Sequence, residues 1–332
     1  MRKKLIAHLL SLTILLLVAN IIIDYLSRKN EVHFDKDLSA SEIEGKFLET
    51  LDECGIELKW IKIKPNRDKE KDSIQNIINV KIPADLPLPV LLHYLQGKIE
   101  EPFIRLTAGE RKKSKEIVLK IFSNGIQKLE SVITKDDKTL RNSTKISFII
   151  SGFNGVSKAK QLELLKSPYP FAVELIPSEK GVVMIDSLRK YKKEHVVLLN
   201  DDLSGKKFLL NESFSNPKLL ASIKNILTAY KYYPLYIIDT SSDLFSQTNY
   251  PIIEKALVAN SIKLLKRNTF FSLDADKKEI TAEKLKQAVF DLNLSNKTFL
   301  IDADNYLIIL DNVDRLFRKG NKIILPGDNS AF

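Results

Sequence analysis

Hydrophobic and charged positions set the beginning of the chain apart from the rest. An almost uncharged run extends from Leu5 to Ile23, after the three cations Arg2, Lys3 and Lys4. About twenty apolar residues are enough to cross a bilayer as a helix, and cations before such a run favour an N-terminus that stays in the cytoplasm. We therefore expect a membrane anchor at residues 1–27, a polar tether at 28–39 and the bulk of the chain on the far side of the membrane.

A cleaved signal peptide is the competing interpretation of this run. Such a peptide has a shorter apolar core and a small-x-small cleavage site. Neither Val18-Ala19-Asn20 nor Tyr25-Leu26-Ser27 supplies a convincing site of that kind, so the pattern favours an uncleaved anchor.

A small α+β domain is predicted for residues 40–134. Apolar residues on one helical face follow Ser41 and Glu44, which have the spacing of a capping box. The predicted strands are 56–63, 74–82, 117–122 and 126–133, and a helix is predicted to begin near Pro87 and Pro89. Asn124-Gly125 is a strong signal for a two-residue hairpin between the last two strands. The polar segment 135–144 is the predicted linker to the next domain.

From residue 145 to residue 332 the pattern changes to short apolar strands that alternate with helices. The predicted strands are 145–150, 171–176, 196–199, 235–238, 262–265, 299–301 and 322–325, and the predicted helices are 157–166, 184–193, 217–231, 250–260, 282–292 and 305–319. This alternation is typical of an α/β fold with a mostly parallel sheet. About seven such units predict an irregular (β/α) barrel, in which functional groups gather beyond the C-terminal strand ends.

Charge and cysteine content narrow the classes of partner. Lys and Arg total 52 against 42 Asp and Glu, a formal charge of +10, but the basic runs lack the interleaved aromatic residues of nucleic-acid-binding motifs. We therefore expect no nucleic-acid partner. Cys54 is the only cysteine, so an intramolecular disulfide is excluded. An exported chain without a disulfide is typical of a bacterial periplasm.

The predicted strand ends carry the residues that bear on function. They read Ile150-Ser151-Gly152, Leu199-Asn200-Asp201, Ile238-Asp239-Thr240, Arg267-Asn268 and Ile301-Asp302. In order and spacing, these segments resemble the divergent polysaccharide deacetylase family, a branch of the NodB-like (β/α)-barrel deacetylases. The resemblance covers most of residues 145–326 and leaves out the anchor and the small domain.

The resemblance implies that several active-site positions of the family are substituted in this chain. Ser151 and Gly152 stand where the family has paired aspartates, Asn200 where it has a histidine, and Asn268 where it has an aspartate. Metal-assisted deacetylation needs fixed His or carboxylate ligands and a general base. Serine, glycine and asparagine side chains supply neither, so the resemblance assigns no catalytic or metal-binding residue in this chain.

Five aspartates are nevertheless predicted at or just beyond strand ends: Asp201, Asp202, Asp239, Asp302 and Asp304. An all-oxygen cluster would suit a divalent cation such as Mg²⁺ or Ca²⁺, which makes Asp201, Asp239 and Asp302 the candidate metal ligands. Asp239 and Asp302 are also the candidate catalytic groups. The alternative is that these aspartates cap the helices that follow, as Asp commonly does in βα loops.

Two functions follow as expectations. The first is a protein anchored in the bacterial inner membrane and facing the periplasm, whose deacetylase-like barrel has little or no catalysis and binds an envelope polysaccharide or a protein partner. The second is an active metal-dependent deacetylase or hydrolase of envelope polysaccharide that uses the residual carboxylates. No cofactor is expected except a divalent metal in the second case. Tyr169, Phe171, Phe214 and Phe245 are the aromatic candidates for stacking on sugar rings.

Overall fold

The computed structural model describes residues 37–66, 76–111, 114, 116–141, 143–231, 235–275, 277–291 and 297–328. The predicted anchor and most of the predicted tether lie outside these residues. Within them, no helix combines the length and the apolar character that a membrane crossing requires. The chain divides into two compact units. The boundary along the chain falls between Leu140 and Arg141, and residues 53–55 are grouped with the second unit.

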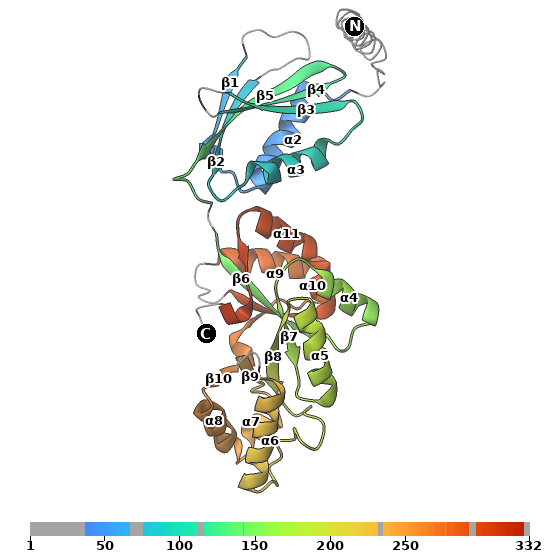
Figure 1. Cartoon of the computed structure of the whole chain (residues 1–332), viewed down its shortest axis with the longest axis vertical. Helices are drawn as coiled ribbons and strands as arrows, with labels where there is room; N and C mark the ends of the chain where they lie inside the picture. Colours follow the sequence, from blue (N-terminus) through green and yellow to red (C-terminus); the bar gives the residue numbers. More distant parts are fainter. Residues whose placement is uncertain are drawn as a thin grey trace, which may run out of the picture. The chain divides into compact units, whose positions relative to one another are not determined.

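The first unit is a five-stranded sheet with two helices on one face (Figure 1). Its elements are α2 (Ala40–Glu53), η1 (Leu58–Trp60), β1 (Ile61–Pro65), β2 (Asn76–Pro83), α3 (Leu88–Ile99), β3 (Ile104–Glu110), β4 (Ile117–Ser123) and β5 (Ile126–Asp136). The strand order is β1-β2-β5-β4-β3. Only β2 and β5 pair in parallel. Phe47 and Leu51 of α2 and Leu91 of α3 are fully buried against this sheet.

The Asn124-Gly125 hairpin is confirmed. Both residues have positive φ, 45° and 80°, and β4 pairs antiparallel with β5. The prediction missed β3, because Thr107, Ala108 and Gly109 are exposed and lack the apolar alternation of a half-buried strand.

The capping box was predicted two residues too far along the chain. The backbone N–H of Ser39 donates to Glu42 Oε2 at 2.8 Å, and the N–H of Glu42 donates to Ser39 Oγ at 3.2 Å. The pair at Ser41 and Glu44 has the same spacing, but the helix begins earlier because Ala40 is itself buried in the core.

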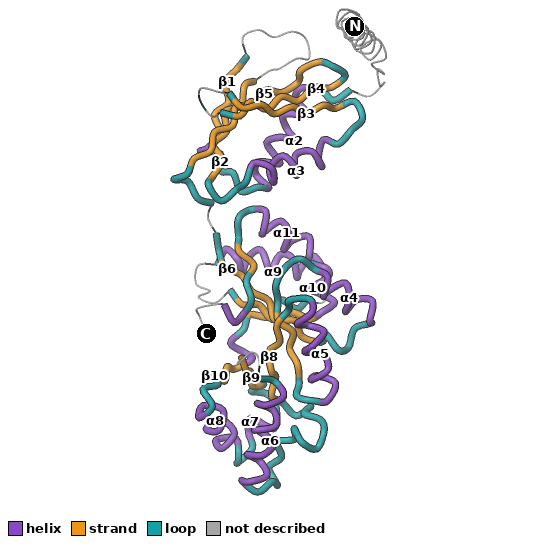
Figure 2. The backbone as a smooth tube through the Cα atoms, in the orientation of Figure 1, coloured by secondary structure: helices purple, strands orange, loops and turns teal. Residues whose placement is uncertain are grey.

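The second unit is an α/β fold built on a parallel sheet (Figure 2). Its strands are β6 (Lys145–Ser151), β7 (Ala172–Leu175), β8 (Glu194–Leu199), β9 (Leu235–Ile238), β10 (Lys263–Lys266), β11 (Phe271–Ser272), β12 (Thr298–Asp302) and β13 (Lys322–Ile323). Its helices are α4 (Lys158–Lys166), α5 (Glu179–Lys190), α6 (Asn216–Ala229), α7 (Asp243–Ser246), α8 (Tyr250–Ala259), η2 (Arg267–Thr269), α9 (Lys278–Phe290), α10 (Ala303–Ile308), α11 (Leu310–Arg318) and η3 (Pro326–Asp328).

The two faces of this sheet carry different cores. Residues such as Phe148, Val173 and Val197 point to one face and pack with the helices in the main core. Alternate residues such as Ile149, Ala172 and Leu198 point to the other face and form a smaller core with Phe270. Because side chains alternate along a strand, β6, β7, β8, β9 and β12 each contribute buried residues to both cores.

The sheet is curled into an incomplete barrel. Its order is β10-β9-β8-β7-β6-β12-β11, with β13 also on β6. If it were flat, the six intervals between β10 and β11 would separate these edges by about 29 Å. However, Lys266 at the end of β10 and Phe271 at the start of β11 are five residues apart in the chain, and so at most about 17 Å. The segment that contains η2 therefore crosses the open seam, and Phe270 from this segment fills the concave face.

Most predicted elements of this unit are present, but several have different bounds and two were missed; for example, α9 begins at Lys278 rather than at residue 282. Helix α5 begins at Glu179 rather than at residue 184, because Ser178 caps it and accepts a bond from the N–H of Gly181 at 3.0 Å. The predicted helix 305–319 is two helices that meet at Ile309. The short elements α7 and β11 were not predicted, because they are too short for a periodic signal.

Candidate functional site

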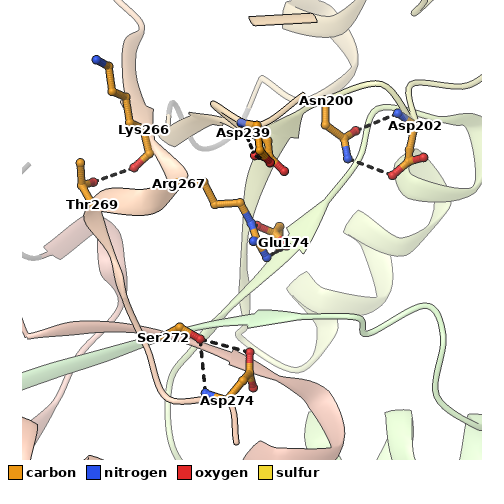
Figure 3. Close-up of polar contacts among 10 residues, drawn as sticks. Glu174, Asn200, Asp202, Asp239, Lys266, Arg267, Thr269, Ser272 and Asp274 are labelled. Atoms are coloured by element: carbon orange, nitrogen blue, oxygen red, sulfur yellow. Dashed lines mark hydrogen bonds and ion pairs between the residues drawn. The ribbon is translucent and has the colours of Figure 1, made fainter. Parts of the chain in front are cut away.

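An ion pair spans the concave face of the curled sheet. Arg267 follows β10 and Glu174 lies on β7, with β9 and β8 between these strands in the sheet. The guanidinium of Arg267 donates two hydrogen bonds to the Glu174 carboxylate, Nε to Oε1 at 2.8 Å and Nη2 to Oε2 at 3.2 Å. Figure 3 shows Arg267 reaching inward to Glu174 between the strand ends. The Glu174 side chain is only 5% exposed, so this charge is enclosed with its partner.

Arg267 is the positive centre of an acidic neighbourhood. Its pKa is raised, first by the hydrogen bonds to Glu174 and then by attraction to Glu174, Asp239 and Asp274, while burial opposes the rise. Three carboxylates around one guanidinium leave a surplus of negative charge at this end of the barrel.

Asp239 lies at the C-terminal end of β9 and faces this neighbourhood (Figure 3). Its Oδ1 accepts bonds from the backbone N–H of Ser241 at 2.9 Å and from Ser241 Oγ at 2.6 Å. The pKa of Asp239 is lowered, first by the Ser241 hydroxyl, then by the Ser241 N–H and by Arg267, against the effect of burial. The carboxylate is therefore ionised at neutral pH.

The end of β6 has no room for a side chain at position 152. Ser151 ends the strand and stands in register with Asp302 of β12. Gly152 has a φ of +67°, and a Cβ at this position would lie 2.3 Å from Asp302 Oδ2. Asp302 in turn caps α10, because its Oδ1 accepts the N–H of Asp304 at 2.9 Å. The Asp302 carboxylate thus fills the space that a side chain at position 152 would need.

The end of β8 is organised by local hydrogen bonds. The side chain of Asn200 donates to Asp202 Oδ2 at 2.9 Å and accepts the N–H of Asp202 at 3.1 Å (Figure 3). The Asp201 carboxylate accepts hydrogen bonds from the backbone N–H groups of Asp243 and Leu244, both at 2.8 Å, at the start of α7. Asp201 and Asp302 therefore both have helix-capping contacts, whereas Asp239 faces Arg267.

The remaining candidates lie at the edge of the site. Asp304 accepts a bond from Lys160 Nζ at 2.6 Å, with both side chains about half exposed. Asn268 is exposed in η2, next to the inward-facing Arg267.

Within the described part of the chain, no three His, Cys, Asp or Glu side chains are grouped so that they could hold a metal ion. The donor set does not fit the family's metal, because a serine, a glycine and an amide stand at its ligand positions. The ligand roles of Asp201, Asp239 and Asp302 stay predictions.

A cavity of about 500 Å³ opens beside these strand ends. Its lining combines apolar, hydroxyl and charged side chains from β7, from helix α5 and from the loops after β6, β7 and β8, among them Phe153, Glu174, Ser178, Lys180, Asp202 and Ser204. Of the aromatic candidates for sugar stacking, Phe171 is fully buried and Tyr169 nearly so, and both pack in the main core. These two cannot stack on a ligand. Phe214 and Phe245 are half-buried at the edge of the same core.

A second group of ionisable residues lies at the opposite end of the strands. The position of His195 before its predicted strand indicates this end of the barrel, whereas the burial of Lys193 and Glu194 beside it was not predicted. Glu194 and His195 open β8, with Lys193 before them, and all three are buried. Burial lowers the pKa of Lys193 to about 8 and that of His195 to about 4. Burial and, after it, the charge of Asp328 raise the pKa of Glu194 to about 7, whereas the Gly327 N–H acts against the rise. The only sequence signal was three consecutive ionisable residues just before a predicted strand.

The buried amine of Lys193 has a structural role. Its Nζ donates to the backbone oxygens of Ser167 at 2.7 Å and Tyr169 at 2.5 Å, beyond the end of α4, and lies 4.5 Å from the centre of the Phe171 ring. His195 packs 5.8 Å from the Tyr230 ring on the helix-covered face. Both residues lie at the end of the barrel away from the candidate site.

No protein-family model and no curated protein matches this sequence. Among solved structures, the chain is similar to a CE4 family pseudoenzyme from Bacillus anthracis in its wild-type form, with 10% identity, a TM-score of 0.38, and coverage of 66% of this chain and 87% of that one. A mutant of that pseudoenzyme with restored enzymatic activity matches at 10% identity and a TM-score of 0.37, over 66% of this chain and 90% of that one.

Proposed function

We propose that this chain is a membrane-anchored, periplasm-facing protein of the divergent polysaccharide deacetylase type, whose barrel binds an envelope polysaccharide or a protein partner and has lost most or all catalysis. The irregular barrel of that family is the architecture we infer for the second unit, with an open seam in place of full closure. The anchor is the predicted helix at residues 1–27.

The observation that carries the proposal is the arrangement of the candidate site. A metal-dependent deacetylase needs ligands that are free to coordinate and a base that faces the bound substrate. Here the Asp302 carboxylate caps a helix and occupies the space at Gly152, Asn200 is bonded to Asp202, and Asp201 holds the start of α7. The Arg267–Glu174 pair fills the centre between them.

Binding without catalysis remains compatible with the cavity beside this site. A volume of about 500 Å³ is within the usual range for small-molecule sites. Its carboxylates, hydroxyls and single lysine can exchange hydrogen bonds with the hydroxyl groups of one or two sugar rings. Lys180 and Asp202 are the lining residues whose replacement should weaken such binding most directly.

The test is to compare hydrolysis and binding on the same acetylated amino-sugar oligomers. We expect no release of acetate above background in the presence of added Zn²⁺, Mg²⁺ or Ca²⁺, together with saturable binding in calorimetry. Asp202→Ala should weaken the binding, and Asp328→Ala, at the far end of the strands, is the matched control. Release of acetate that disappears in Asp239→Ala would refute the loss of catalysis.

An active hydrolase is the second candidate, and one observation favours it. Asp239 is the only candidate at a matching family motif whose carboxylate faces Arg267 and is held ionised, as a general base must be. If it acts as a base, activity should depend on Asp239 and survive Asp201→Asn, because Asp201 contacts α7 instead.

The anchor is tested separately from the activity. We expect the full-length chain to remain in the membrane fraction after alkaline carbonate washing, and the barrel to be digested by protease added to spheroplasts. Release of the chain by carbonate, or protection of the barrel in intact spheroplasts, would contradict the proposed location without bearing on the site.

A further inference from the structure

The two edges of the small unit's sheet differ in how they are protected. Edge strands expose backbone hydrogen-bonding groups, and proteins commonly protect them with lysine or proline. Strand β1 at one edge follows that rule, with Lys62, Lys64 and Pro65 exposed. Strand β3 at the other edge has no charge between Leu106 and Gly109 and no proline. Within the described residues, no further strand pairs with β3 on its outer side.

The pairing with β4 fixes which backbone groups of β3 face outward. The N–H of Arg111 donates to Glu116 O at 2.8 Å, and the N–H of Asn124 donates to Phe103 O at 3.0 Å. With Arg105 opposite Phe122 in register, the odd-numbered residues of β3 bond to β4. In an antiparallel pair these bonds alternate, so the N–H and C=O groups of Leu106, Ala108 and Glu110 point to the open edge.

We propose that β3 pairs with β3 of a second copy of this chain, in an antiparallel register centred on Thr107. When a two-fold axis joins the two sheets into one, odd-numbered residues of β3 lie opposite odd-numbered residues of the second copy, and even-numbered residues lie opposite even-numbered ones. Among such registers, the one centred on Ala108 would place Arg105 against Arg111 of the other copy. The one centred on Leu106 would pair only residues 104–108 of the seven-residue strand, whereas the register centred on Thr107 pairs all seven.

The register centred on Thr107 is complementary in size and in hydrogen bonding. It places Arg105 opposite Gly109 and Leu106 opposite Ala108, so each large residue faces a small one. Leu106 and Ala108 then exchange hydrogen bonds through their outward-facing groups, and the two Thr107 side chains form a cross-strand pair, which is a favourable combination. The result is a ten-stranded sheet made from two five-stranded ones.

The contact is expected to be reversible, since a single pair of seven-residue strands is smaller than the interfaces of stable dimers. Two chains confined to one membrane would meet at a much higher effective concentration than in solution. The dimer does not depend on the activity of the barrel.

The experiment is cysteine cross-linking of the full-length chain in membranes. Directly opposed residues in a non-hydrogen-bonded pair have Cα atoms about 4.5 Å apart, within disulfide range. Thr107→Cys should therefore give a disulfide-linked dimer on mild oxidation, at least tenfold more than Ala108→Cys or Lys64→Cys on the protected edge. The native Cys54 is buried, so the unmodified chain is the blank.

A second variant, Thr107→Lys, tests the same contact without a cysteine in β3. Thr107→Lys would place two ammonium groups against each other only in the dimer, because Thr107 is exposed in the single chain. We expect the dimer fraction in sedimentation velocity to fall at least tenfold while the thermal midpoint stays within a degree. Equal cross-linking at positions 64, 107 and 108, cross-linking to a different protein, or an unchanged dimer fraction in Thr107→Lys would overturn the proposal.

Discussion

Arg267 and Glu174 hold each other through two hydrogen bonds, at 2.8 and 3.2 Å, although two strands of the sheet separate them. Their contact is a direct consequence of curling, because only a strongly bent sheet brings the end of β10 opposite β7. The pair therefore links the shape of the barrel to the electrostatics of its candidate site.

Removal of one member of this pair should destabilise the barrel more than removal of both. Arg267→Met leaves the Glu174 carboxylate enclosed without its partner, which should lower the free energy of unfolding by about 3 kcal/mol. In Arg267→Met with Glu174→Gln, we expect a loss below about 1.5 kcal/mol, because the uncompensated charge is gone. Hydrogen exchange of β7 and β10 is the suitable measurement, since the only tryptophan, Trp60, lies in the small unit. Equal losses in the single and double variants would show that the unpaired charge of Glu174 is not what destabilises Arg267→Met.

A side chain at position 152 should be poorly tolerated. Gly152→Ala adds a methyl group that would lie 2.3 Å from Asp302 Oδ2, on a backbone with a φ of +67°. We expect a loss of about 2–3 kcal/mol, of which the left-handed backbone accounts for about 1–2 kcal/mol. Adding Asp302→Ala should relieve the collision and leave the backbone term, although it also removes the cap of α10. Calorimetric unfolding of the three variants separates these contributions.

The stability of the barrel should depend on pH through Glu194. The folded-state pKa of Glu194, about 7, lies above the ordinary value of 4.5. Its contribution to the stability of the barrel is therefore complete below pH 4.5 and is lost as the pH rises to 7. Glu194→Gln should therefore stabilise the barrel at pH 8 by about 1–3 kcal/mol and have little effect at pH 4.5.

His195 changes stability in the opposite direction and has to be separated from Glu194. The pKa of His195, about 4, lies below the ordinary value of 6.5. Its contribution to the stability of the barrel is therefore present above pH 6.5 and is lost as the pH falls to 4. The comparison is made between Glu194→Gln and the unmodified chain at each pH, so that the contribution of His195 cancels. A difference that does not change between pH 4.5 and pH 8 would contradict the raised pKa of Glu194.

In the small unit, Asp37 should stabilise the buried ammonium of Lys128. The Lys128 side chain is fully buried and its Nζ lies 2.9 Å from Asp37 Oδ2; Asp37 also accepts a bond from the Ser123 hydroxyl. We expect Asp37→Ala to lower the free energy of unfolding by about 2–3 kcal/mol. Lys128→Met, which removes the buried charge, should have a smaller effect. Trp60 fluorescence in urea follows this unit without interference from the barrel.

The fold of the second unit was predictable from its alternation of short apolar strands and amphipathic helices, because that pattern reports burial on two sides of a parallel sheet. The open seam was not predictable. It depends on the five-residue passage from Lys266 to Phe271, which looks like an ordinary loop in the sequence. Strand β3 was missed for a related reason, since an exposed edge strand is held by its neighbour and not by its own apolar residues.

The sequence predicted which aspartates lie at strand ends but not what they contact. The strand-end rule gave Asp201, Asp239 and Asp302 as one group, yet only the folded chain shows that Asp201 and Asp302 bond to helix N-termini. Glu174 was overlooked because an acidic residue inside an apolar strand has no partner in the sequence. That partner, Arg267, comes 93 residues later.

The crowding between Gly152 and Asp302 couples substitutions at these two positions. An aspartate introduced at position 152 would collide with the carboxylate already present, so the substitution would be harmful until position 302 had changed first. The end of β6 can therefore accept a larger residue only through an ordered pair of changes, and the same substitution at position 152 would have different effects depending on the residue at position 302.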